Sequence, residues 1–262
     1  MQGLLALQVA ATATAAVAVG YLAWKYLKED VARSVARILN ERACKETYPK
    51  YVILIRHGES EANVDTSVYS HMPDHRVSLT ERGKEQARNA GMEIRDLIGE
   101  EGSIGMYVSP FRRCVQTCEE VRKALGHRVH FTWEDPRIRE QEWGNLQEHA
   151  DVISQRRQRS HVGRFYYRFR DGESGADVYD RISMFLESLF RRFQKPSCPR
   201  NIIIVSHGLA IRLFLMRYFH WPVALFEMSI NLENAEYCIM KFCPDTGKYV
   251  LLKGCRFEGD EP

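Results

Sequence analysis

Hydrophobic positions follow two alternating patterns from residue 51 onward. Short runs rich in β-branched residues are separated by longer stretches in which apolar residues recur every third or fourth position. The short runs predict strands at Tyr51–Ile55, Met106–Val108, Val129–Thr132 and Ile202–Val205, and a final hairpin of Glu236–Phe242 and Tyr249–Leu252. This alternation predicts an α/β fold, a three-layer sandwich with a mostly parallel central sheet whose strands are connected by helices.

Helices are predicted where apolar residues share one helical face. The first face consists of Ala87, Ala90, Ile94, Leu97 and Ile98, with Thr80 placed to cap the helix. The second consists of Val178, Ile182, Phe185, Leu189 and Phe193. A third apolar stretch, Leu209–Phe219, is also expected to be helical. No repeat or long Pro/Gly-rich linker interrupts these elements, so one domain is expected over residues 48–262.

The amino-terminal residues differ in composition from the rest of the chain. Gly3 to Trp24 contain no charged side chain and are rich in Ala, Val and Leu. A helix of about 20 such residues rises roughly 30 Å, the thickness of a bilayer core. Lys25 and Lys28 follow among aromatic residues, and no basic residue precedes the span. We therefore expect residues 1–28 to be a transmembrane anchor, in a mitochondrial membrane or the endoplasmic reticulum, with the bulk of the chain facing the cytosol.

Two other interpretations of this segment remain open. Ala16-Val17-Ala18 resembles a processing site, although the basic region of a signal peptide is missing. The helix would also suit the interior of a larger membrane complex. Beyond it, residues 29–47 have apolar positions at helical spacing among charged ones, which predicts an amphipathic connector, either a plain spacer or a partner-binding helix.

Composition and charge exclude several classes of protein. The 262 residues are 45% hydrophobic and 27% charged, a balance that excludes a disordered chain, a collagen or a polytopic membrane protein. The net charge of +3 is too small to predict a nucleic-acid partner. The cysteines number 7, an odd count without a CxxC pair, which is typical of buried thiols in a reducing compartment and not of a disulfide framework or a zinc site.

Two predicted strands end in a histidine followed by a glycine. The sequences are Arg56-His57-Gly58 and Ser206-His207-Gly208. Ligands bind at the carboxyl ends of strands in open α/β sheets, and a glycine allows the backbone to approach the ligand. The helix expected after His207 would point its N-terminus into the same crevice and favour an anion. His57 and His207 are therefore the first candidate site residues.

Further motifs resemble the histidine phosphatase superfamily, also called phosphoglycerate-mutase-like. They occur in the family's order over residues 51 to about 240: Arg56-His57-Gly58-Glu59-Ser60 with Asn63, Ser78-Leu79-Thr80 before Gly83, Ser109-Pro110-Phe111-Arg112-Arg113 with Thr117, Arg139-Glu140 with Gly144, Gly172-Glu173-Ser174, and Ser206-His207-Gly208. The block from Arg139 to Gln147, with Gly163 to Arg168, looks closest to a fungal and plant branch of broad-specificity phosphatases.

The resemblance implies a role for each matched residue. His57 would take the phosphoryl group as a phosphohistidine, which divides hydrolysis into two easier displacements. The residues around the phosphate would be Arg56, Arg113, His207, Asn63 and Gly208. Glu140 would protonate the leaving oxygen and then accept a proton from the attacking water, which requires a raised pKa. Because positioned cations meet the charge of the phosphate, neither a metal nor a cofactor is expected.

Some of these residues have neighbours of the same type, so alternatives remain. Arg112 stands beside Arg113 and is expected to be a solvated helix residue. Glu142 and Glu134 compete with Glu140, which is favoured by its place four residues before Gly144. Asn63 would also suit the cap of a turn.

The segment between Glu140 and Glu173 is rich in arginine. In the superfamily this insert helps to cover the pocket and to select the substrate, so Glu173, Arg164 and Arg168 are predicted substrate contacts. The two arginines would line the pocket mouth if the segment is helical, since they are four residues apart. Arg156, Arg157 and Arg159 fit a solvated face equally well.

The sequence therefore predicts a membrane-anchored phosphatase that hydrolyses phosphate monoesters of a small molecule or a phosphoprotein. Other phosphatase chemistries lack their signatures: no cysteine is followed by an arginine six positions later, and there is no Asp-x-Asp. A mutase is the first alternative, although the interval from Glu140 to His207 is shorter than in cofactor-dependent mutases. The second alternative is a scaffold subunit of a membrane complex, for example a mitochondrial one, that keeps the enzyme fold.

Overall fold

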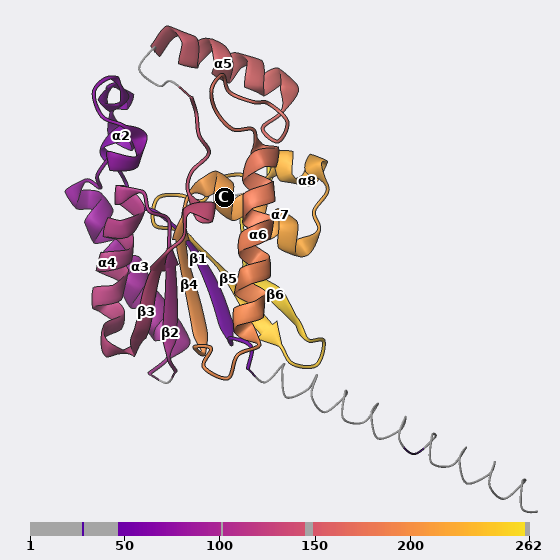
Figure 1. Ribbon diagram of the computed structural model, residues 1–262. Coiled ribbons are helices and arrows are strands. Elements are labelled where there is room, and N and C mark those ends of the chain that lie inside the picture. The colour runs from indigo at the N-terminus through magenta and orange to yellow at the C-terminus, as the bar shows by residue number, and fades with distance from the viewer. Residues whose placement is uncertain (1–27, 29–46, 101, 145–148, 260–262) are drawn as a thin grey trace, which may run out of the picture. The chain divides into compact units, whose positions relative to one another are not determined.

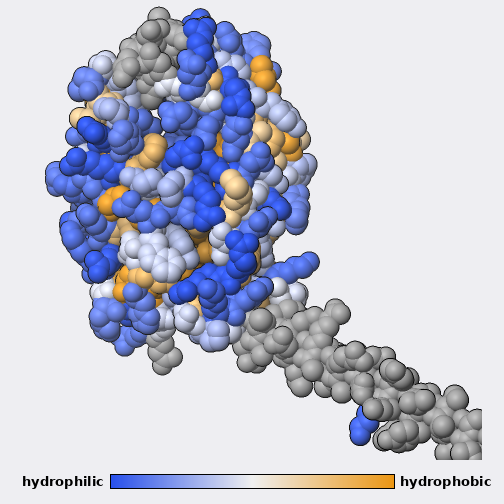
Figure 2. All heavy atoms as spheres, viewed as in Figure 1, coloured by the Kyte–Doolittle hydropathy of each residue, from blue (hydrophilic) through white to orange (hydrophobic). Residues whose placement is uncertain are grey.

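The computed structural model describes residue 28 and residues 47–100, 102–144 and 149–259. The predicted anchor except Lys28 and the predicted connector except Thr47 lie outside the described residues. Within the described part of the chain, no helix is long and apolar enough to cross a membrane. The described residues from Thr47 onward belong to one compact unit. The face of this unit in Figure 2 is mostly hydrophilic, with apolar residues in small separate areas.

The centre of the compact unit is a six-stranded mixed sheet with the order β3-β2-β4-β1-β5-β6. The strands are β1 (Tyr51–Arg56), β2 (Ile104–Val108), β3 (Val129–Glu134), β4 (Asn201–Ser206), β5 (Tyr237–Cys243) and β6 (Lys248–Lys253). The first four strands run parallel, while β5 pairs antiparallel with β1 and β6 antiparallel with β5. All of the predicted strands are confirmed, with ends that differ by one or two residues.

Helices cover both faces of the sheet (Figure 1). The helices from Thr47 onward in the described residues are α2 (Glu61–Val64), α3 (Glu81–Ile98), α4 (Arg112–Leu125), α5 (His149–Val162), α6 (Gly175–Phe193), α7 (Gly208–Phe219) and α8 (Val223–Met228). Short 3₁₀ turns occupy Thr66–Ser70, Asp74–Arg76, Gly126–Arg128 and Pro136–Ile138. Helices α3 and α4 pack on one face and α6 and α7 on the other, whereas α5 lies beyond the carboxyl ends of the parallel strands.

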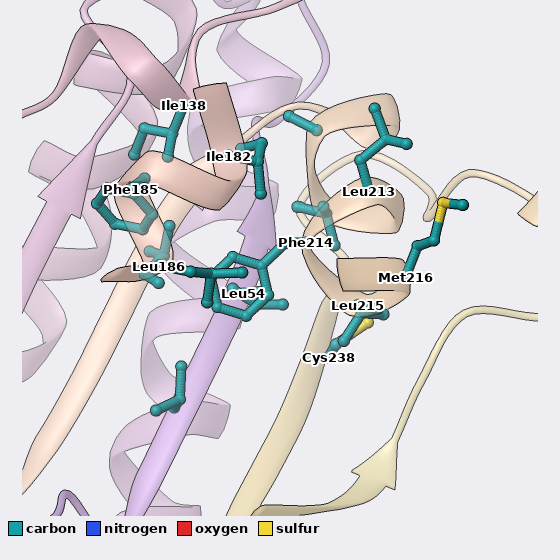
Figure 3. Packing of buried hydrophobic residues seen from close by; sticks show 14 of the residues in the cluster. Leu54, Ile138, Ile182, Phe185, Leu186, Leu213, Phe214, Leu215, Met216 and Cys238 are labelled. Carbon is teal, nitrogen blue, oxygen red and sulfur yellow. The ribbon is translucent and has the colours of Figure 1, made fainter. Parts of the chain in front are cut away.

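The side chains of β1 show why this strand is apolar throughout. Val52 and Leu54 belong to the core cluster that contains α6 and α7, whereas Ile53 and Ile55 belong to the cluster that contains α3 and α4. Successive strand residues point to opposite faces, so a strand covered on both faces needs a continuous apolar run. Figure 3 shows Leu54 close to Phe214 of α7, on the side of the sheet where Phe185 and Leu186 of α6 also lie.

The three predicted helices are confirmed as α3, α6 and α7, with one correction in α3. Thr80 caps α3, since its Oγ1 accepts a hydrogen bond from the Gly83 amide at 2.9 Å. Leu97, however, is 39% exposed, because it lies about 80° from Ala87 around the helix, at the edge of the apolar stripe. The sequence does not predict α5, since polar residues occur all around this helix.

Candidate active site

His57 and His207 meet at the carboxyl ends of two adjacent parallel strands. Arg56 at the end of β1 lies opposite Ser206 at the end of β4, so the histidines that follow are neighbours. Their ring centroids are 5.3 Å apart. His57 is 4% exposed and His207 is fully buried. The structure therefore brings together the two histidines that the sequence placed at one edge of the sheet.

The hydrogen bonds of His57 leave one ring nitrogen free to react. Its Nδ1 lies 2.8 Å from the carbonyl oxygen of Gly58. A carbonyl only accepts, so Nδ1 carries the proton and the Nε2 of a neutral ring keeps its lone pair. Burial, followed by the charges of Arg113 and Arg56, holds the pKa of His57 well below its usual value of 6.5. A neutral imidazole with a free Nε2 is the form that a nucleophile requires.

Two arginines add positive charge beside the histidine pair. Arg113, in the first turn of α4, is 3% exposed, and its Nη2 lies 3.5 Å from Nδ1 of His207. Arg56 at the end of β1 donates from Nη1 to the carbonyl oxygen of Leu232 at 2.5 Å. Exposed Arg112, next to Arg113, points away from the core, as expected for a solvated residue. Buried Arg113 and half-buried Arg56 create a site that favours an anion such as phosphate.

Glu140 is the carboxyl group that contacts the histidine pair. It follows the 3₁₀ turn Pro136–Ile138, and its Oε2 lies 3.5 Å from Nδ1 of His207. Burial raises the pKa of Glu140, and burial also lowers the pKa of His207 well below 6.5. Both shifts favour a neutral pair with the proton on Glu140, the state of a general acid. The competing residues Glu142 and Glu134 are exposed.

The same three residues are also arranged as metal ligands would be. His57, Glu140 and His207 each offer a ligand atom, and these atoms lie within 4.8 Å of one another. Two imidazoles and a carboxylate are ligands that Zn²⁺ accepts. The buried guanidinium of Arg113 beside them opposes a cation and favours an anion in this place.

Sequence reasoning missed two residues that position this site. Ser109 Oγ lies 2.8 Å from Nε2 of His207 and holds the ring. Asp74 pairs with Arg113, since Arg113 Nη1 lies 2.7 Å from the Asp74 carboxylate and 2.9 Å from its carbonyl oxygen. The motif around Ser109 was a signal for the first contact. Nothing in the sequence around Asp74 indicated its contact with Arg113, because that contact joins a 3₁₀ turn to α4, which lies far along the chain.

The glycines of the two His-Gly pairs have a packing role that the sequence did not predict. A Cβ on Gly58 would come within 2.3 Å of the carbonyl oxygen of Gly83, and a Cβ on Gly208 within 2.7 Å of Asn231 Cγ. Each glycine therefore lets two segments of the protein approach each other. Gly208 is also the first residue of α7, the helix whose N-terminus faces the histidines.

Asn63 caps a turn beside the site. Its Oδ1 accepts hydrogen bonds from the amide and the hydroxyl of Ser60, both at 3.0 Å, and from Nδ2 of Asn234 at 3.1 Å. The sequence position of Asn63 allowed either a phosphate contact or the cap of a turn, and these hydrogen bonds are those of a cap.

The other predicted substrate contacts bind protein groups in the structure. Residues 163–174 are turns and irregular backbone, so the helical segment on which the alignment of Arg164 with Arg168 depended is not formed. Gly163, with φ +98°, ends α5 before this segment. Arg164 donates to the carbonyl oxygen of Glu227 at 2.9 Å, and Arg168 pairs with Asp177 at 2.6 Å.

Glu173 binds protein groups in the structure. Its carboxylate lies 2.6 Å from the Arg139 guanidinium and 2.9 Å from that of Arg181. Through Arg139, Glu173 therefore contacts the loop that carries Glu140.

Helix α5 lies over the segment that follows Glu140. The guanidinium of Arg159 stacks 5.0 Å from the ring centre of Trp143, and that of Arg156 lies 5.7 Å from the same ring. Gln155 accepts a hydrogen bond from the amide of Arg170 at 2.7 Å. Arg157 is exposed, as expected for a solvated residue. Helix α5 is thus attached through Trp143 to the loop that carries Glu140.

Comparisons with known proteins agree with this geometry. The model of the histidine phosphatase superfamily (branch 1) matches residues 52–253. The phosphoglycerate mutase-like protein AT74H of Arabidopsis thaliana is 46% identical over 214 residues, which cover 75% of this chain and 75% of the plant protein. The broad-range acid phosphatase DET1 of Saccharomyces cerevisiae is 30% identical over an alignment of 318 positions that covers 86% of this chain and 93% of the yeast protein.

Solved structures share the fold. The α-ribazole phosphatase of Shigella flexneri superimposes with a TM-score of 0.62 at 22% identity, covering 78% of this chain and 95% of that one. A mycobacterial glucosyl-3-phosphoglycerate phosphatase with inorganic phosphate gives a TM-score of 0.57 at 21% identity, covering 77% and 95% of the two chains. At these identities the likeness concerns the fold alone.

Proposed function

The chain belongs to the histidine phosphatase superfamily, and on that premise we propose that it hydrolyses phosphate monoesters through a phosphohistidine on His57. The observation that supports this most is the state of His57, a neutral ring whose Nδ1 is bound to the Gly58 carbonyl and whose Nε2 is free. A nucleophile in this state, with Arg113 and His207 beside it, provides the parts of phosphoryl transfer.

The proposed reaction has two displacements. Nε2 of His57 attacks phosphorus, the bond from phosphorus to the ester oxygen breaks, and the leaving oxygen takes the proton of Glu140. In the second displacement, water attacks the phosphorus of the phosphohistidine and passes a proton to the Glu140 carboxylate. The bond between phosphorus and Nε2 of His57 breaks, and inorganic phosphate leaves. Arg56, Arg113 and His207 would hold the phosphoryl oxygens throughout, so that charge develops among fixed donors.

A release assay separates hydrolysis from the mutase alternative. The full-length protein would be incubated with sugar phosphates, phosphoglycerates, nucleotides and phosphopeptides, and both free phosphate and phosphorylated products would be measured. Stoichiometric release of inorganic phosphate is the result expected for a phosphatase. Isomerised phosphoglycerate without release of phosphate would instead establish a mutase.

The pH profile is predicted by two opposite pKa shifts. His57 must be neutral, and because its pKa lies well below 6.5, we expect it to stay active at pH values where an ordinary histidine is protonated. Glu140 must be protonated, so activity on alkyl esters should fall as pH rises through its raised pKa. The kcat/KM of the wild type and of Glu140→Gln would be compared across pH on one ester. This comparison cancels the ionisation of the substrate itself. A ratio of wild-type to Glu140→Gln activity that does not fall as pH rises would contradict the assignment.

Metal independence is a further part of the proposal. Arg56 and Arg113 supply the positive charge that a metal would otherwise supply, so incubation with EDTA should leave kcat/KM unchanged. The measurement is activity after dialysis against the chelator, with and without added Zn²⁺ or Mg²⁺. Loss of activity in EDTA that a divalent ion restores would show that the His57, Glu140 and His207 cluster holds a metal.

The proposal includes membrane attachment through residues 3–24, on the basis of their uncharged sequence. The full-length protein should remain in the membrane pellet after alkaline carbonate. A chain that lacks residues 1–28 should keep its turnover on small esters, because every motif lies beyond Tyr51. Carbonate extraction of the full-length protein would identify a peripheral segment. A truncated chain recovered only with other subunits would favour the scaffold alternative.

A further inference from the structure

We infer that Arg181 and Glu173 are positioning residues that hold the loop of the general acid, so that Glu140 can deliver its proton to the leaving group. The inference rests on the proposed function, because it assigns a partner to the acid of that reaction. It concerns residues 137–142, called the acid loop below.

Beyond Arg137 and Ile138, which end a 3₁₀ turn, the acid loop lacks the backbone partners that a strand or a helix would give it. After the 3₁₀ turn Pro136–Ile138, the chain has no regular secondary structure as far as Gly144. In a loop of this kind the carbonyl groups do not receive the hydrogen bonds that backbone amides donate within a sheet or a helix. Its conformation therefore depends on other groups that bind these carbonyls.

Arg181 supplies those donors. It lies on the buried side of α6 and is 6% exposed. Its Nη1 donates to the carbonyl oxygens of Arg137 at 2.7 Å and Arg139 at 2.9 Å, and its Nη2 donates to that of Glu140 at 3.0 Å. One planar guanidinium thus fixes three carbonyls of the acid loop, including that of the acid itself.

Glu173 holds both Arg181 and the other side of the loop. Its carboxylate accepts from Nε and Nη2 of Arg181 at 3.0 and 2.9 Å, which is a bidentate pair. It also accepts from the Glu142 amide at 3.0 Å, while the Glu173 amide donates to the Glu142 carbonyl at 2.8 Å. Nε2 of Gln141 donates to the Glu173 carbonyl at 2.8 Å. The acid loop is therefore bound on both flanks of Glu140.

Arg181 and Glu173 do not bind the Glu140 carboxyl group, which stays available for proton transfer. Its Oε1 accepts from the Gln141 amide at 3.0 Å, and its Oε2 faces His207 at 3.5 Å. Arg181 and Glu173 act on the backbone that carries this carboxyl. A shift of about 1 Å at a catalytic group can cost on the order of 10²-fold in rate. The pair should therefore set the efficiency of proton transfer without contacting the substrate.

The dependence on the leaving group tests this role. Arg181→Lys keeps the charge but cannot reach three carbonyls in a planar fork. We expect it to lower kcat/KM on alkyl phosphates by roughly 10- to 100-fold and on 4-nitrophenyl phosphate by less than about 3-fold, because only alkyl esters need the proton. Glu173→Gln, which keeps the shape of the side chain, should show the same selectivity if Arg181→Lys fails to fold.

Arg212→Lys is the matched control. Arg212 is 2% exposed and, like Arg181, has its guanidinium fully engaged, in this case with Ser229, Asn231 and the Phe226 carbonyl on α8. The loss of a buried arginine there should affect both ester classes equally. The inference is wrong if Arg181→Lys lowers activity equally on both classes, or if Arg212→Lys shows the same selectivity as Arg181→Lys.

A double-mutant cycle separates this inference from the proposed function. In the Glu140→Gln background, Arg181→Lys should cost less than about 3-fold on alkyl phosphates, because the acid that it positions is gone. Equal losses in both backgrounds would overturn the positioning role. If Glu140→Gln alone shows no dependence on the leaving group, the proposed role of Glu140 fails first, and with it the reason for a positioned acid loop.

Discussion

Replacement of His57 by alanine is expected to reduce turnover to background on every ester, a loss on the order of 10⁴- to 10⁶-fold, as for removal of a covalent nucleophile in other hydrolases. The physical reason is that His57 presents a free Nε2 at the site, beside Arg113 and His207. Steady-state phosphate release by the purified variant measures this loss. A melting curve would show that the variant is folded, since His57 is buried.

Three further variants are controls for this result. His71→Ala removes an exposed histidine from the 3₁₀ region and should leave kcat unchanged. Cys114→Ser and Cys118→Ser should also retain most of the activity. Burial raises the pKa of both thiols, that of Cys118 to about 12, so neither is a thiolate nucleophile near neutral pH. Turnover by His57→Ala within about 10-fold of the wild type would move the nucleophile to another residue.

Replacement of Glu140 by glutamine should have the second largest effect, and only on some substrates. Alkyl phosphates have a poor leaving group that needs a proton in the transition state, whereas 4-nitrophenolate leaves without one. A positioned general acid contributes roughly 10²- to 10⁴-fold, so kcat on alkyl esters should fall by that factor while the aryl ester is affected far less. Glutamine keeps the shape of the side chain and cannot supply an acidic proton.

Glu142→Gln is the matched control for the acid. Glu142 lies two residues away on the same loop and is exposed, although burial of part of its side chain and the Asp74 charge raise its pKa as well. This variant should retain the wild-type ratio of alkyl to aryl activity. Selectivity that follows Glu142 and not Glu140 would transfer the role of the acid to Glu142.

The sequence predicts most of the fold because both kinds of periodicity are strong in this chain. The continuous apolar run of β1 results from burial on both faces of a sheet, and the stripe of α6 from burial on one side of a helix. Helix α5 could not be found in this way. Its Arg159 stacks on Trp143, so the helix is attached through cation–π contacts that leave no periodic pattern in the sequence.

The candidate site was predictable where its residues end a strand or begin a helix. His57 and His207 follow β1 and β4, and Arg113 lies in the first turn of α4, so the local sequence carries the signal. Contacts that join distant segments carried no such signal. Asp74 reaches Arg113 over 39 positions, and Arg181 reaches the Glu140 carbonyl over 41 positions. The same limitation explains why the role of Glu173 was not predicted: it was expected at the substrate, whereas in the structure it contacts the acid loop and Arg181.

Trapping the phosphoenzyme tests the role of His57 as the nucleophile most directly. The full-length protein would be mixed with a ³²P-labelled or unlabelled ester, quenched within milliseconds, digested and analysed by mass spectrometry under alkaline conditions, which preserve phosphohistidine. We expect a phosphate on His57 that is lost in acid, stable in alkali and absent from His57→Ala. An acid-stable phosphate on a serine, or full activity with no phosphorylated peptide at any quench time, would contradict it.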